Sequence, residues 1–116
     1  MKSLRAVAAI ALLSAFFSSA QAQTQIAGGE TFLLGGEQKK VLLVQGRNIG
    51  KFAVEISAEK DGKTKLLQVV QPGFILSQKF GPGEIARFRN VSKTERAVIQ
   101  FKMTKDVGTL SMRYSQ

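Results

Sequence analysis

Residues 52–63 read FAVEISAEKDGK, and apolar and polar side chains alternate strictly along residues 52–59. Successive side chains of a β-strand point to opposite faces, so this alternation predicts a half-buried strand. Asp61-Gly62 follows, a pair that tolerates the positive φ angles of a tight hairpin turn. The stretch therefore predicts a β-hairpin whose second strand covers residues 64–70.

Short apolar segments of the same kind lie on both sides of this hairpin, and Gly or Pro-Gly turns separate them. This spacing is typical of all-β domains, and short turns between consecutive strands favour antiparallel pairing. We expect one antiparallel β-sandwich of immunoglobulin-like type with about seven or eight strands. The alternative is a small closed β-barrel. The further strands that we expect are residues 30–34, 39–45, 74–80, 84–91, 96–104 and 109–114.

One of these strands contains Val41-Leu42-Leu43-Val44, a continuous apolar run. Such a run predicts a central strand that is buried on both faces. Its high β-propensity and lack of charge also fit a self-associating segment, with Lys39-Lys40 and Arg47 as flanking charges that oppose aggregation. Residues 23–29 precede the first expected strand, and we expect them to form a loose amino-terminal arm.

The first residues have the layout of a secretory signal peptide. Lys2 and Arg5 give a positive start, residues 6–17 are almost entirely apolar, and Ala20-Gln21-Ala22 fits the small-x-small cleavage pattern. We therefore expect a signal peptide over residues 1–22.

Cleavage there leaves a single β-sandwich domain over residues 23–116. A membrane-spanning helix needs about 20 apolar residues, so the apolar run of the leader is too short, and we expect no transmembrane segment. The leader predicts export to the periplasm or the extracellular space, and its alanine-rich composition favours a bacterial source.

The composition excludes several kinds of chemistry. The chain has no Cys and no His, so it lacks a thiol nucleophile, a disulfide, a thiolate or imidazole metal ligand, and a histidine general base. Glu55 and Glu59 share one strand face, but four residues of extended chain separate them by about 13 Å, too far for a glycosidase pair. We therefore expect a non-enzymatic protein without a cofactor or a metal.

The chain is strongly basic, with 17 Lys and Arg residues, 8 acidic residues and a formal net charge of +9. If the apolar positions of residues 84–91, 96–104 and 109–114 point inward, the opposite positions carry cations and no acid. We expect these three successive strands to present one basic surface for an anion or an acidic partner; the alternative is a solvated face that keeps the protein soluble. The residues of the expected surface are Arg87, Arg89, Arg96, Lys102 and Arg113.

A weaker pair of candidates lies in residues 46–50. Arg47 and Asn48 stand between two glycines, and we expect them at a loop tip where they could touch a ligand.

These observations favour an exported binding domain whose partner is an anionic envelope polymer or an acidic protein. Nucleic acid is not an expected partner, because the chain has one Tyr and no Trp for base stacking. The competing hypothesis is a structural or assembly protein that acts through strand-edge pairing. Fibre or pilus-type subunits and periplasmic assembly chaperones would be examples, and self-association through an edge strand would follow.

Overall fold

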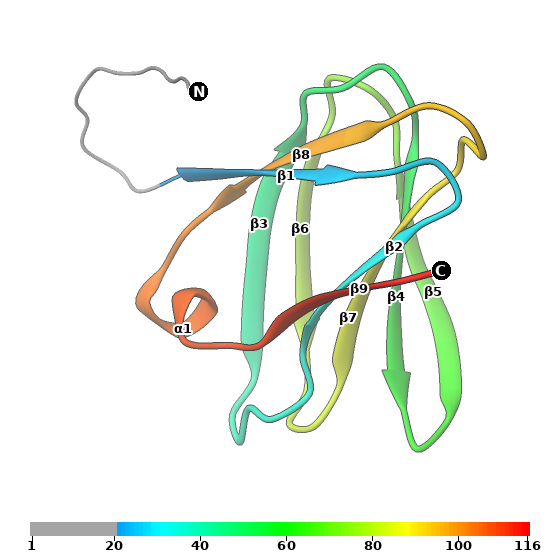
Figure 1. The fold of residues 1–116 in the computed structure, drawn as a ribbon. Helices are drawn as coiled ribbons and strands as arrows, with labels where there is room; N and C mark the ends of the chain where they lie inside the picture. Colours follow the sequence, from blue (N-terminus) through cyan, green and yellow to red (C-terminus); the bar gives the residue numbers. More distant parts are fainter. Residues whose placement is uncertain (1–20) are drawn as a thin grey trace, which may run out of the picture.

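The computed structural model describes residues 21–116. Residues 1–20, which carry most of the expected signal peptide, lie outside the described residues. The described part of the chain contains nine strands and one short helix (Figure 1). In chain order they are β1 (Gln21–Ile26), β2 (Thr31–Gly35), β3 (Leu42–Asn48), β4 (Val54–Lys60), β5 (Lys63–Val70), β6 (Ile75–Phe80), β7 (Ile85–Asn90), β8 (Ala97–Lys102), α1 (Lys105–Gly108) and β9 (Met112–Ser115).

The strands form two antiparallel sheets, which Figure 1 shows as two layers. One sheet has four strands in the order β1-β8-β3-β6, and the other has five in the order β5-β4-β7-β2-β9. Each sheet keeps its own two edge strands, so the sheets do not close into a barrel. The expected all-β sandwich is confirmed, and the alternative of a closed barrel is wrong. The nine strands exceed the seven or eight that we expect from the sequence, because residues 21–26 form an additional strand.

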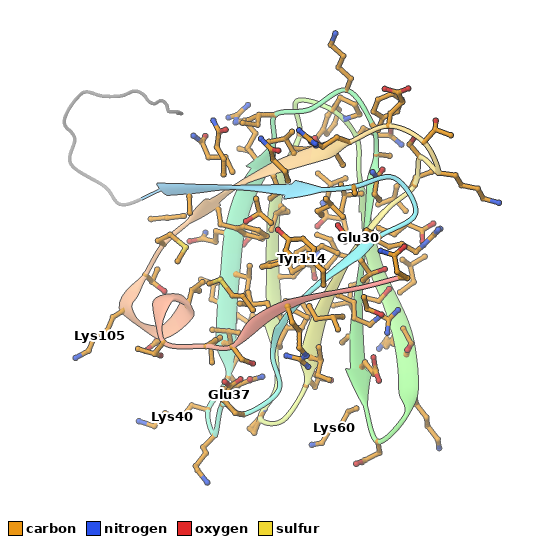
Figure 2. All side chains as sticks on the ribbon, in the orientation of Figure 1. Glu30, Glu37, Lys40, Lys60, Lys105 and Tyr114 are labelled. Atoms are coloured by element: carbon orange, nitrogen blue, oxygen red, sulfur yellow. The ribbon has the colours of Figure 1, made fainter. Side chains whose placement is uncertain are left out.

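The core lies between the two sheets and is built around aromatic rings. Phe88 of the five-stranded sheet and Phe101 of the four-stranded sheet meet edge to face, with centroids 5.1 Å apart. Phe32 packs on both of them, and the Tyr114 ring lies 5.3 Å from Phe32 (Figure 2 labels Tyr114). Burial raises the pKa of the Tyr114 hydroxyl, and the nearby Glu30 carboxylate adds to this effect. The inward orientation expected for Phe88 and Phe101 is confirmed.

The connections differ from the expectation that consecutive strands pair. Within residues 21–116, the hairpin of β4 and β5 is the one case in which consecutive strands are neighbours in a sheet. A turn of a few residues can join two strands about 4.8 Å apart, but it can equally cross the roughly 10 Å between two layers. The hairpin turn itself is confirmed, with positive φ angles at Asp61 and Gly62.

Two further expected turns are confirmed, and both carry the chain between the sheets. At Pro72-Gly73, Gly73 has a φ of 86°, and the Phe74 amide donates to the Gln71 carbonyl at 3.0 Å. The Gly81–Glu84 turn is similar, since the Glu84 amide donates to the Gly81 carbonyl at 3.1 Å. A glycine after proline at such a turn supplies the positive φ that the type II geometry needs.

The expected loose arm is wrong, because residues 21–26 form strand β1. β1 pairs along β8, with Ile26 opposite Ala97 and Thr24 opposite Ile99. Ile26 is completely buried, so a single apolar side chain anchors the strand to the core. Cleavage after Ala22 would leave residues 23–26 of this strand.

The run Val41–Val44 is buried on one face, so the expectation of burial on both faces is wrong. Leu42 and Val44 face the core, whereas Val41 is 62% exposed and Leu43 is 43% exposed. No layer covers the outer face of this sheet within the described residues. β3 lies between β8 and β6, so its central position is confirmed, although β8 pairs only with Gly46–Asn48 of the strand.

Two buried asparagines hold the corners where β3 and β7 end. The Asn48 side chain donates to the carbonyls of Phe52 at 2.8 Å and Val70 at 3.0 Å, and its oxygen accepts from the Gly50 amide at 3.0 Å. Asn48 ends β3 and is fully buried, so its expected position at a loop tip is wrong. The hydrogen bonds of the Asn48 side chain therefore stabilise the fold.

Asn90 holds the corresponding corner of the five-stranded sheet, at the end of β7. Its amide donates to the carbonyls of Ile26 at 3.0 Å, Ala27 at 3.2 Å and Glu95 at 2.6 Å, and its oxygen accepts from the Ser92 amide at 2.9 Å. The side chain therefore ties the end of β7 to the chain after β1 and before β8.

Candidate functional site

The five cations of the expected basic surface do not share one face. Arg87 and Arg89 lie on β7 and Arg113 lies on β9, all in the five-stranded sheet. Lys102 ends β8 in the four-stranded sheet, and Arg96 is exposed directly before that strand. The expectation of one surface from three successive strands is wrong, because β8 crosses to the other layer.

On the five-stranded sheet, carboxylates neutralise the two β7 arginines. Arg89 stands directly opposite Glu55 on β4, and the two side chains form an ion pair of 2.8 Å. Arg87 reaches Glu59 at 2.7 Å, which lies two residues along β4 from the position opposite it. Opposite charges on neighbouring strands attract across the sheet, so the charge of both arginines is largely compensated.

Arg113 fastens β9 to the strand beside it. Its Nη1 donates to the Gly35 carbonyl at 3.3 Å and to the Ser111 hydroxyl at 3.1 Å. The Ser111 amide donates to Glu37, which lowers the pKa of the Glu37 carboxyl, and Arg113 adds to that effect. The local role of Arg113 is therefore to hold the carboxyl-terminal strand in place.

The outer surface of the other sheet carries no acid. Its residues alternate with the buried positions of β1, β8, β3 and β6, so their side chains point away from the core. We call this set the four-stranded outer face. It consists of Gln23, Gln25, Leu43, Gln45, Arg47, Ile75, Ser77, Lys79, Val98, Gln100 and Lys102.

Strand register places amides and cations in adjacent rows on this face. Gln23 lies opposite Gln100, Gln100 lies opposite Arg47, and Arg47 lies opposite Ile75. Gln45 lies opposite Ser77 in the next row. Neighbouring strands are about 4.8 Å apart, and outward positions follow each other at about 6.8 Å along a strand. The face is therefore a regular array of hydrogen-bonding groups with positive charges among them.

A hollow of about 240 Å³ lies in the middle of this array. β3 and β8 approach so closely beside it that a Cβ atom on Gly46 would lie 2.5 Å from the Gln100 carbonyl oxygen. Arg47 Nη1 donates to the Gly73 carbonyl at 3.1 Å, which holds the guanidinium near the start of β6. The lining residues are Gln45, Gly46, Arg47, Ile75, Gln100 and Lys102.

The positive charges of this face take part in no ion pair within residues 21–116. Both ion pairs found within residues 21–116 lie on the opposite sheet. In the described part of the chain, no carboxylate comes within ion-pairing distance of Arg47, Lys79 or Lys102. These three cations are available to an external anion.

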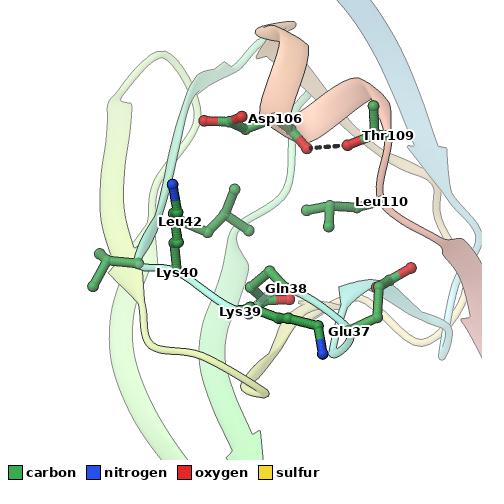
Figure 3. Close-up of a pocket in the computed structure, with 9 residues that line it drawn as sticks. Glu37, Gln38, Lys39, Lys40, Leu42, Asp106, Thr109 and Leu110 are labelled. Carbon is green, nitrogen blue, oxygen red and sulfur yellow. Dashed lines mark hydrogen bonds between the residues drawn. The ribbon is translucent and has the colours of Figure 1, made fainter.

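A second pocket, of about 390 Å³, lies between α1 and the segment that joins β2 to β3 (Figure 3). Leu42 and Leu110 form its apolar walls, while Lys39 and Lys40 stand near Glu37 and Asp106. Figure 2 also labels Lys105, whose side chain extends away from the body of the molecule. Because the pocket carries both signs of charge, it selects neither anions nor cations.

The sequence predicts Lys102 and Arg47 as candidate site residues, but it does not predict the rest of the four-stranded outer face. Lys79 was within an expected strand, and its alternation with Ser77 and Ile75 was the available signal. The glutamines gave no signal of their own, since isolated glutamines are ordinary on exposed strands. Only the pairing of β1, β8, β3 and β6 brings them together.

Within residues 21–116, no group of three or more acidic side chains is placed to hold a metal ion. That part of the chain also contains no helix with the length and apolar character to cross a membrane. Comparison with protein-family models, with curated proteins and with solved structures finds no match to this chain.

Proposed function

We propose that this protein is an exported, non-enzymatic binding domain that binds an anionic polymer through the four-stranded outer face. Arg47, Lys79 and Lys102 supply the charge. The proposed mechanism is a preformed surface, because strand pairing fixes the backbone under every contact residue. The signal-peptide pattern of residues 1–22 supports export, and the absence of Cys and His supports the proposed lack of catalysis.

One observation carries the proposal, namely the distribution of acids between the two outer faces. The five-stranded sheet pairs its β7 arginines with Glu55 and Glu59, whereas the four-stranded outer face has three cations and no carboxylate. Strand register places no two of these three cations directly opposite each other, so each can contact a separate charged group of one anionic chain.

The immunoglobulin-like type of the sandwich belongs to the same proposal. Its support is the division of nine antiparallel strands into sheets of four and five, which is the strand count of variable-type immunoglobulin domains. In such sandwiches, exposed sheet faces and end loops commonly bind partners.

The test compares retention on immobilised heparin, used as a model polyanion, between two variants of equal charge change. The face variant is Arg47→Gln/Lys79→Gln/Lys102→Gln, and the control is Lys60→Gln/Lys63→Gln/Lys65→Gln at the exposed hairpin. The face variant should lose roughly tenfold or more in affinity. Three exposed ionic contacts of about 0.5–1 kcal/mol each exceed the 1.4 kcal/mol of one decade.

The control variant should keep most of its affinity, and wild-type retention should fall as salt rises, because the Debye length shrinks from ~10 Å at 0.1 M to ~3 Å at 1 M. Equal losses in both variants would mean that net charge alone drives binding. No loss in either would reject the proposal and favour the competing hypothesis of assembly through strand edges, which depends little on salt.

The hypothesis that β7, β8 and β9 present one basic surface predicts a different result for a third triple variant. Under it, Arg87→Gln/Arg89→Gln/Arg113→Gln should abolish retention. Under the present proposal this variant keeps most of its affinity, because Arg87 and Arg89 are already paired with glutamates.

A further inference from the structure

We infer that the ligand of the four-stranded outer face is an acidic polysaccharide, a chain of hydroxyl-bearing sugars that carry carboxylates. This inference rests on the proposed function, since it names the class of anion for the same face. It comes from the groups that stand between the cations.

Amides outnumber cations on this face. Gln23, Gln25, Gln45 and Gln100 present four side-chain amides, and all four are at least partly exposed. Each amide has two N–H donors and one carbonyl acceptor. A ligand that satisfies these groups must offer both acceptors and donors.

This requirement separates the anionic polymers. A polyphosphate chain presents oxygen acceptors and no donors, so it would leave the glutamine carbonyls without partners. An uncompensated polar group at an interface costs free energy, because it loses its hydrogen bond to water. Sugar hydroxyls donate and accept, so a polysaccharide can satisfy both ends of every amide.

The cations suit carboxylates set along such a chain. A guanidinium has five N–H donors in a planar fork that matches a carboxylate. In Arg47, one of these donors is hydrogen-bonded to the Gly73 carbonyl. That bond fixes the side chain beside the hollow, so the remaining donors are positioned before a ligand arrives. Lys102, in the wall of the same hollow, adds a second charge.

An apolar margin borders the array at the start of β6. Ile75 is 61% exposed and lines the hollow, and Phe74 directly before it is 65% exposed. The C–H face of a sugar ring can pack on such side chains without giving up hydroxyl hydrogen bonds. A nucleic acid would need several aromatic platforms for its bases, whereas Phe74 is the one exposed aromatic side chain beside this face within residues 21–116.

The test measures binding of purified protein to three anionic polymers in solution at equal concentration of charged groups. They are polygalacturonate, which has carboxylates and ring hydroxyls, polyglutamate, which has carboxylates and backbone amides but no hydroxyls, and polyphosphate. Wild type should bind polygalacturonate roughly fivefold or more tightly than the other two, because its hydroxyls lie on the same ring as each carboxylate, whereas polyphosphate has no donors and the donors of polyglutamate lie on its backbone.

The decisive variant removes amides and keeps every charge. Gln45→Ala/Gln100→Ala should lower affinity for polygalacturonate roughly fivefold or more and affinity for polyglutamate and polyphosphate much less, because those polymers pair with fewer of the amide groups. The matched control, Gln71→Ala/Gln116→Ala, removes two exposed glutamines outside the face and should change none of the three. Thermal melts of both variants should match wild type, because all four side chains lie outside the core.

The outcomes separate this inference from the proposed function. Equal binding of all three polymers, with no effect of the amide variant, would overturn the polysaccharide inference while leaving the anion-binding face intact. Preference for polyglutamate would point to an acidic protein instead. Undiminished binding of fully methyl-esterified polygalacturonate would show that charge is not required, and would overturn both.

Discussion

The two outer faces of this sandwich both carry exposed cations but reach opposite electrostatic results. On the five-stranded sheet, β4 brings Glu55 and Glu59 next to the arginines of β7, and the charges cancel in two ion pairs. On the four-stranded sheet, the neighbours of Arg47 are Gln100 and Ile75, and the charge stays free. Whether a cation is available depends on the strand beside it, and a count of basic residues does not show this.

The largest expected effect concerns the core that joins the two faces. Phe88→Ala in the five-stranded sheet and Phe101→Ala in the four-stranded sheet should each lower the free energy of unfolding by roughly 3–5 kcal/mol, because each removes a buried ring. The rings touch, so the double variant should lose less than the sum of the two. Denaturant titrations measure the free energy of unfolding of the two single variants and the double variant. A loss below about 1 kcal/mol in either single variant would mean that its ring is not in the core.

The next effect should be confined to the four-stranded sheet. Gly46→Ala places a Cβ against the Gln100 carbonyl, and we expect a loss of roughly 1–3 kcal/mol together with weaker anion binding, because β3 and β8 must shift. Gly62→Ala in the hairpin of the other sheet is the control. Its Cβ meets nothing within 4 Å, so only the strain of its positive φ remains, at about 1 kcal/mol. Equal losses would show that β3 and β8 have room for a side chain there.

A gain of function would sharpen the comparison between the faces. Glu55→Gln/Glu59→Gln should cost only about 0–1 kcal/mol per lost pair, because both pairs are partly exposed to solvent. The change frees Arg87 and Arg89, so retention on heparin should rise. Adding Arg87→Gln/Arg89→Gln to this variant should remove the gain. If the gain persists, it comes from net charge and not from the freed arginines.

The smallest expected effect is a local pH response near β9. The Ser111 amide holds the pKa of Glu37 below its ordinary value, so the contact is present at neutral pH and is lost as pH falls through the lowered pKa. An NMR titration of the Ser111 amide should follow this step, and Glu37→Gln should abolish it. A midpoint at or above the ordinary glutamate value would contradict the contact. Global stability should hardly change, because Glu37 is exposed.

The comparison of the two faces also separates the features of the fold that local sequence patterns predict from those that they do not. Alternation in residues 52–59 identified strand β4, and Asp61-Gly62 identified its hairpin, because strand pleat and turn geometry depend on neighbours in the chain. The same alternation placed Phe88 and Phe101 inward correctly. It failed for β1, where one buried isoleucine was too weak a signal.

The candidate site was predicted only in part. Lys102 and Arg47 were recognised as candidates, but Lys102 was grouped with Arg87, Arg89 and Arg113, which lie in the other layer. The sequence predicts Asn48 as a contact residue because Gly46 and Gly50 bracket its segment, although its side chain closes a corner of the fold. Nothing in a linear pattern shows that a polar side chain will point into the core.

The sequence by itself determined the strands, the turns and the alternation of inward and outward side chains, since these depend on residues a few positions apart. The amino-acid composition also determined the excess of positive charge. Only the tertiary structure decided which strands are neighbours, because a short turn can lead to the next strand of a sheet or across to the opposite layer. That choice put Glu55 beside Arg89 and left Arg47 among amides, and so it decided which of these strand cations is paired and which is free.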